Sequence, residues 1–157
     1  MKTNNSNNNN SKNYSLDAIL ARDDYKRMTA QLKDKVQAIA RRIYNKMEEL
    51  DIDEAIRVDG VTIKRSSVSS SVGTYDFLAI IVDYSDDYDD YQERHSLEDV
   101  DCEYYYGGDF SAKVRGASNK EALAFLNAAK DFILALGELE QKQAADIKQA
   151  IKDNEDI

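Results

Sequence analysis

The chain has 157 residues, with 30 Asp or Glu against 21 Lys or Arg, a net charge of −9, a single Cys and a single His. A chain of this length buries roughly 70% of its unfolded surface, so a core forms without cross-links; one Cys excludes an internal disulfide and a zinc site built from several Cys ligands. The negative charge argues against direct binding of nucleic acid, because affinity for phosphates comes from clustered Lys and Arg.

The first 13 residues are rich in Asn, with seven of them in the segment. Such a composition buries too little surface to offset the entropy of ordering, which predicts a disordered tail over residues 1–13 and a single domain over residues 14–157. This segment lacks the apolar stretch of a signal peptide, and no apolar run approaches the roughly 18 residues of a membrane span. We therefore expect a cytoplasmic protein without membrane contact.

Apolar residues recur at helical spacing from Leu16 to Leu50. Ser15 is placed to cap the start of this run. Either one long helix or two helices separated near Asp23 and Asp24 fit the pattern, and we favour a short helix followed by a longer one. The stripe from Met28 to Leu50 is expected to face the core.

Residues 54–65 are predicted to form a hairpin, because Asp59-Gly60 tolerates the positive φ angles of a two-residue turn. Closing the turn there gives three pairs on one face: Val58 with Val61, Ile56 with Ile63, and Glu54 with Arg65 as an ion pair. A Ser-rich connector over residues 66–73 is expected to follow. Residues 75–84 then carry apolar side chains in both alternating sets, which predicts a central strand.

Residues 103–115 are predicted to form a second hairpin that turns at Gly107-Gly108 and places Tyr105 opposite Phe110. Ser118 and Glu121 have the spacing of a capping box, which predicts the start of a helix. Its apolar pattern continues thinly past Gly137, and its last two turns are expected to fray. The sequence thus predicts an α+β fold, with a four-stranded antiparallel sheet made of two hairpins and long N- and C-terminal helices packed on one face.

The negative charge is concentrated in residues 83–109, which hold eleven carboxylates and only Arg94 as a cation. Six of the ten tyrosines lie in the same segment. Close carboxylate pairs repel by about 1 kcal/mol each in water and by more near a low-dielectric surface. An ordered arrangement of this segment therefore needs something to offset the repulsion.

Three interpretations of this segment compete. The first is a solvated loop, with a variant in which its charges are neutralised by the basic face of the first helix: Lys26, Arg27, Lys33, Lys35, Arg41, Arg42 and Lys46. The second is imitation of a nucleic acid, in which spaced carboxylates and tyrosines dock on a basic protein surface. The third is a calcium loop, since Asp87, Asp89 and Glu98 match three ligand positions of an EF-hand. Tyr91 and Gln92 interrupt that pattern where a ligand and a turn Gly are needed, so we expect no specific calcium site.

The sequence offers little for catalysis. His95 is expected to be an incidental surface residue whose charged form is favoured by nearby carboxylates. Cys102 lies between Asp101 and Glu103, which disfavours the thiolate that a nucleophile requires. Phosphate-binding, nucleophile-elbow and zinc-protease motifs are absent from the sequence. We expect no enzyme activity, no metal site and no cofactor.

The sequence favours a non-enzymatic acidic binding protein that inhibits or regulates a nucleic-acid-binding protein. Small inhibitors encoded by phages and other mobile elements act in this way, by presenting acidic residues to a basic protein surface. The alternative is a structural or assembly protein, a homo-oligomer that self-associates through its long helices. The residues expected to contact a basic partner are Asp83, Asp86, Asp87, Tyr88, Asp89, Asp90, Tyr91, Glu93, Glu98, Asp99, Asp101 and Glu103.

Overall fold

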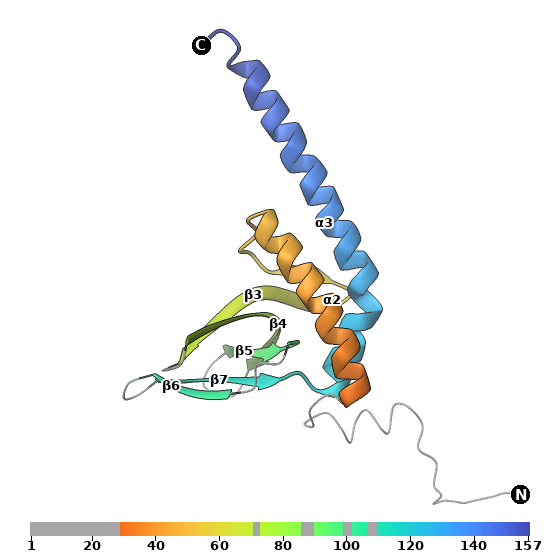
Figure 1. The fold of residues 1–157 in the computed structure, drawn as a ribbon, viewed down its shortest axis with the longest axis vertical. Coiled ribbons are helices and arrows are strands. Elements are labelled where there is room, and N and C mark those ends of the chain that lie inside the picture. The colour runs from red at the N-terminus through yellow and green to blue at the C-terminus, as the bar shows by residue number, and fades with distance from the viewer. Residues whose placement is uncertain (1–28, 71–72, 86–89, 99–101, 107–109) are drawn as a thin grey trace, which may run out of the picture.

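Two helices lie together on one face of a mixed β-sheet (Figure 1). The computed structural model describes residues 29–70, 73–85, 90–98, 102–106 and 110–157. Its elements are, in chain order, α2 (Ala30–Glu49), β2 (Ile56–Val58), β3 (Val61–Ser70), β4 (Gly73–Ser85), β5 (Asp90–Ser96), β6 (Cys102–Tyr106), β7 (Phe110–Gly116) and α3 (Asn119–Asp153). The predicted tail over residues 1–13, the cap at Ser15 and the break near Asp23 lie outside the described residues.

The predicted α+β class is confirmed, but the predicted four-stranded antiparallel sheet is wrong. The described strands form one six-stranded sheet in the order β2-β3-β4-β5-β7-β6. All neighbours are antiparallel except β5 and β7, which run parallel and pair through His95 with Arg115 and Ser96 with Gly116. Strand β5 was missed because its sequence, DYQERHS, has no alternation of apolar residues.

The β2–β3 hairpin confirms the predicted turn and most of the predicted register. Val58 pairs with Val61 and Ile56 with Ile63, and both turn residues, Asp59 and Gly60, have positive φ. The predicted ion pair between Glu54 and Arg65 is wrong. Arg65 instead pairs with Asp53 at 2.7 Å and donates a hydrogen bond to the Ile52 carbonyl.

The Ser-rich segment after this hairpin is a strand, so the predicted connector over residues 66–73 is wrong. Strand β3 continues to Ser70, and it pairs with β4 from Ile63 to Ser70. Val68 in this stretch is buried against Phe77. A single buried apolar side chain and continuous backbone pairing are enough to extend the strand through a run of serines.

Strand β4 is central, as predicted, because it pairs with β3 on one side and with β5 on the other. Leu78 and Ile80 face the core that lies under the helices. Phe77 and Ala79 face a second, smaller core on the opposite side of the sheet, together with Val68 of β3 and Val114 of β7. The β6–β7 hairpin therefore packs across the face of β3 and β4 that the helices leave uncovered, and β4 is buried on both faces.

The β6–β7 hairpin exists as predicted, but its register differs by one residue. Tyr106 pairs with Phe110 and Tyr105 pairs with Ser111. The prediction placed Tyr105 opposite Phe110 because it assumed a two-residue turn at Gly107-Gly108. The observed pairing leaves residues 107–109 as the connection, which is one residue longer.

The stripe on α2 faces the core, as predicted; its buried side chains are Val36, Ala40, Ile43, Tyr44 and Met47. The two helices run parallel (Figure 1). The Thr29 N–H donates to Asn119 Oδ1 at 3.0 Å near their starts, and Lys46 pairs with Glu140 at 2.7 Å near the end of α2. The Gln143 side chain then donates to the Leu50 carbonyl at 2.8 Å, which closes the last turn of α2 onto α3.

The predicted capping box at the start of α3 is confirmed. The Glu121 N–H donates to Ser118 Oγ, and the Ser118 N–H donates to the Glu121 carboxylate at 2.9 Å. The helix then continues past Gly137 to Asp153. In the part of the chain that the structure describes, neither helix is long and apolar enough to cross a membrane.

Candidate functional site

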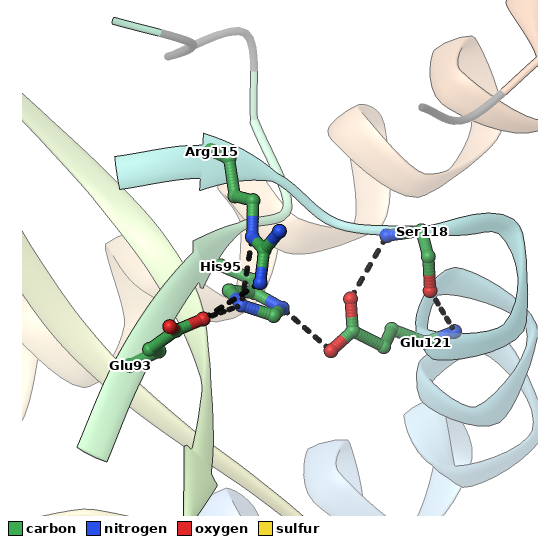
Figure 2. A network of polar contacts seen from close by, with 5 residues as sticks. All are labelled: Glu93, His95, Arg115, Ser118 and Glu121. Atoms are coloured by element: carbon green, nitrogen blue, oxygen red, sulfur yellow. Dashed lines mark hydrogen bonds and ion pairs between the residues drawn. The ribbon is translucent and has the colours of Figure 1, made fainter. Parts of the chain in front are cut away.

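A network of charged side chains lies where β5, β7 and the start of α3 meet (Figure 2). Glu93 and His95 are two residues apart on β5, so they lie on the same face of the strand. Arg115 of β7 pairs with His95 across the parallel ladder. Glu121 reaches the network from the first turn of α3, where the capping box fixes its position.

His95 is the centre of this network and is only 5% exposed. Its Nδ1 lies 2.6 Å from Glu121 Oε2, and its Nε2 lies 2.9 Å from Glu93 Oε1. Arg115 donates to the same Glu93 oxygen at 2.8 Å. Both ring nitrogens therefore face carboxylates, which is the arrangement that suits a doubly protonated imidazolium.

The pKa of His95 is raised despite its burial. Burial by itself lowers the pKa, but hydrogen bonds to the carboxylates of Glu121 and Glu93 outweigh that effect, and the positive charge of Arg115 opposes them only weakly. The pKa of Glu121 is lowered: burial raises it, and the hydrogen bonds from His95 and the Ser118 N–H outweigh the burial. The pKa of Glu93 is lowered in the same way by His95 and Arg115.

The expectation that His95 is an incidental surface residue is wrong, because the ring is buried and bonded at both nitrogens. The expectation that carboxylates favour its charged form is confirmed. With no free ring nitrogen, His95 is not placed to act as a general base or a metal ligand. Its observed role is to join β5 to the start of α3. From the sequence, Glu93 and His95 are expected to lie side by side only if residues 90–96 form a strand, because residues two apart then share a face.

Glu98 makes a second internal contact at the end of β5. Its Oε2 accepts from the Leu78 N–H at 2.7 Å, and its Oε1 pairs with Arg41 Nε at 2.7 Å. Glu98 lies just beyond the last residue of β5, and its carboxylate accepts a hydrogen bond from a backbone N–H of the central strand β4. Burial raises the pKa of Glu98, although the Leu78 N–H and Arg41 both act to lower it.

The structure separates the predicted partner-binding residues into two groups. Glu93 and Glu98 are bound internally, as described above. Asp83, Asp90 and Tyr91 are exposed where the β4–β5 ladder approaches its connection. Glu103 lies on β6, opposite Lys113. Asp86, Asp87, Tyr88, Asp89, Asp99 and Asp101 lie outside the described residues.

Two interpretations of the acidic segment are affected by these positions. A solvated loop between the central strand and the second hairpin is wrong over residues 90–96, because they form strand β5. Among the described residues, the first helix neutralises the segment where Arg41 pairs with Glu98, whereas Lys46 pairs with Glu49 and Glu140. Glu98, one of three acids in the calcium pattern, is engaged by Arg41. Among the described side chains, no group of three or more His, Cys, Asp or Glu is arranged to hold a metal ion.

An open surface hollow of about 500 Å³ lies between α2 and the start of β4. Its lining comes from one face of α2, from the first residues of β4 and from Glu98: Asp34, Gln37, Ala38, Arg41, Tyr75, Asp76 and Glu98. Of these residues, the sequence singled out only Glu98, as a partner-binding candidate, and Arg41, as part of the basic face of the first helix, because α2 and β4 are far apart in the chain. Compared with known protein families, curated proteins and solved structures, the chain matches none of them, so the proposals below rest on its own geometry.

Proposed function

We propose that this chain is a non-enzymatic assembly protein that self-associates through the C-terminal part of α3. The observation that carries the proposal is that every side chain from Glu138 to Asp153 is exposed, although the helix is continuous. At 35 residues α3 is about 52 Å long, and at 20 residues α2 is about 30 Å long. The free end of α3 projects well past α2 and the sheet (Figure 1).

The projecting part of α3 carries an apolar stripe. Ile147 and Ile151 are 61% and 65% exposed, and they follow Gln143 at intervals of four residues. Gln143 contacts the end of α2, so the stripe continues the face of α3 that packs against α2 lower down. The small residues Ala144 and Ala150 flank the stripe and allow another helix to approach closely.

A second copy of α3 fits this stripe. A helix of this length without tertiary contacts is marginally stable in water, and its internal support, such as Lys142 with Asp146 at 3.2 Å, contributes only a few tenths of a kcal/mol. In an antiparallel pair centred on Ile147, the exposed isoleucines of one copy lie against those of the other. The proposed pair therefore covers both stripes.

The test of self-association is a double variant, Ile147→Asp with Ile151→Asp. Sedimentation of the unmodified protein from about 1 µM to 1 mM is expected to show a rise in mean mass, and the variant is expected to remain monomeric, since four charges would be buried in the paired stripes. The matched control is Gln141→Asp with Gln149→Asp, which adds the same charge to the opposite face and is expected to associate as before. A strict monomer over the whole range, or equal loss in both variants, contradicts the proposal.

A second candidate function is the inhibition or regulation of a basic, nucleic-acid-binding protein in the cytoplasm by residues 83–109. The observation that favours it is the exposure of Asp83 and Asp90 beside Tyr91, which is 48% exposed. Within the described residues neither of these carboxylates is in an ion pair, and Asp83 accepts only from Gln92. Glu93 and Glu98 are occupied internally, so the proposed contact surface depends on the other acids of the segment.

Salt is expected to weaken the binding of a basic partner and to strengthen self-association. A cationic protein bound at 50 mM salt is expected to be released at 500 mM, because screening weakens attraction between opposite charges. Self-association is expected to strengthen, since the projecting end of α3 has more acids than lysines. Pull-down at the two salt concentrations, with Asp86, Asp87, Asp89 and Asp90 replaced by Asn as the comparison, is the measurement. Retention that is unchanged by salt and by the substitutions contradicts the second candidate.

A further inference from the structure

We propose that the outer seam between α2 and α3 is an interaction surface that binds an acidic amphipathic helix of another protein. The seam is the line along which the two helices meet on the side away from the sheet, with Lys35 and Arg42 on its α2 border and Lys130 on its α3 border. The proposed self-association uses Ile147 and Ile151, further along α3, so the two surfaces are separate.

The seam widens into a groove of about 480 Å³ toward the end of α2. The lining of the groove includes the buried Ile43 and Leu136 and the half-buried Ile133. Gly137 also lines it, and beyond its own turn of helix no atom lies within 4 Å of the point that a Cβ would occupy there. A side chain of a docked helix can therefore enter between α2 and α3 at this glycine.

Apolar side chains continue the groove toward the start of both helices. Leu32 and Ile39 are seven residues apart on α2, and Leu126 and Ile133 are seven apart on α3, so each pair lies on one side of its helix. All four pack against the core and leave part of their apolar surface exposed. Leu134, next to Ile133, is 66% exposed. From Leu32 to the groove the strip extends about 16 Å, which is enough for about three turns of a docked helix.

Unpaired cations border the apolar strip on both sides. Lys35 and Arg42 are seven residues apart on α2, and Arg42 lines the groove, so both lie on the α2 border. Lys130 precedes Gly137 of the groove by seven residues, so it lies on the α3 border in the same way. All three side chains are exposed, and among the described residues none of them is in an ion pair.

The carboxylates at the groove already have a partner. Glu49 and Glu140 both pair with Lys46, at 2.8 and 2.7 Å. The seam therefore has a positive border, although the whole chain has a net charge of −9. This border attracts an acidic ligand and disfavours a basic one. Apolar side chains flanked by cations fit a helix whose own apolar face is flanked by Asp or Glu.

The experiment is an NMR titration of the full chain with a synthetic helical peptide that has Leu at intervals of three and four residues and Glu on both flanks. The backbone amides of Ile39, Arg42, Ile133 and Gly137 are followed. We expect saturable shifts with a dissociation constant on the order of 10 µM, because the peptide is ordered as it binds. Binding is expected to weaken several-fold between about 50 and 500 mM salt, since screening reduces the attraction.

Two control peptides separate the apolar from the charged contribution. The first has the same composition with its Leu residues scattered around the helix, and the second has Lys in place of Glu. Each is expected to bind at least about tenfold more weakly than the acidic amphipathic peptide.

Charge reversal on both borders tests the site. Arg42→Glu with Lys130→Glu is expected to weaken binding of the acidic peptide about tenfold. The matched control is Arg57→Glu with Lys64→Glu, which makes the same charge change at two exposed residues of β2 and β3. Their side chains lie on the face of the sheet opposite the helices, so this variant is expected to bind the peptide as the unmodified protein does.

Two other occupants of the seam give distinct results. Shifts of the seam amides on dilution without peptide identify a second copy of the chain, and shifts caused by Leu16→Asp with Leu20→Asp identify the chain's own N-terminal residues; either result overturns the proposal. Absence of saturable shifts, equal binding of the peptide with scattered Leu, or equal weakening in both double variants also overturns it.

Discussion

Replacing Phe77 by alanine is expected to lower the free energy of unfolding by about 4 kcal/mol. Phe77 is fully buried, and it packs against Val68 and Val114 on the side of the sheet opposite the helices. Its truncation removes the largest described side chain of this core, and β3 and β4 cannot close the cavity without losing their pairing. Urea unfolding followed by circular dichroism measures the change.

The control for this variant is Tyr75→Ala on the same face of the same strand. Tyr75 is 42% exposed, so its loss is expected to change the stability by less than about 1 kcal/mol. If alanine at residue 77 destabilises no more than alanine at residue 75, the β6–β7 hairpin does not cover this face in solution. Phe77→Leu keeps an apolar side chain at this position, so its loss of unfolding free energy is expected to lie between those of Phe77→Ala and Tyr75→Ala.

Replacing His95 by alanine is expected to lower the free energy of unfolding by about 3 kcal/mol at most, because it leaves the half-buried Glu121 carboxylate without its nearest charged partner. The effect is expected to depend on pH. The folded-state pKa of His95 is raised, so its contribution is complete below the unfolded pKa near 6.5 and is lost as pH rises through the raised value. The pKa values of Glu93 and Glu121 are lowered, so their contribution is lost as pH falls through the lowered values.

The difference in unfolding free energy between the unmodified protein and the His95→Ala variant is therefore expected to peak between roughly pH 5 and 6.5. Chemical unfolding at intervals of pH measures this profile. His95→Gln, which keeps hydrogen-bonding atoms but has no titratable charge, is expected to give a flatter profile. A difference that is constant from pH 4 to 9 would show that the charge of His95 contributes nothing to the stability.

Local chemistry made some parts of this fold predictable. Asp59-Gly60 determines a turn by itself, and the turn then determines the pairing of Ile56 with Ile63. Ser118 and Glu121 likewise define the start of α3 within four residues. In each case the interacting atoms lie close together in the sequence, so no knowledge of the rest of the fold is needed.

The parts that the sequence did not predict depend on contacts between distant residues. Strand β5 has a charged sequence and owes its position to backbone pairing with β4 and β7. His95 is buried because Glu121, 26 residues later, comes to lie against it. The hollow needs α2 to be placed over β4, which no local pattern specifies. The charge pattern located the acidic segment, but it did not reveal that Glu93 and Glu98 have partners inside the protein.

The parallel arrangement of α2 and α3 has an electrical consequence. In an antiparallel pair the helix macrodipoles cancel, but here they add, with both amino ends together near Thr29 and Asn119. Each end is equivalent to roughly half a positive charge, and the opposite ends to half a negative charge. The helical layer therefore has a permanent dipole moment along its length, and an electric field or a cationic surface would orient this layer with the projecting end of α3 toward the positive side.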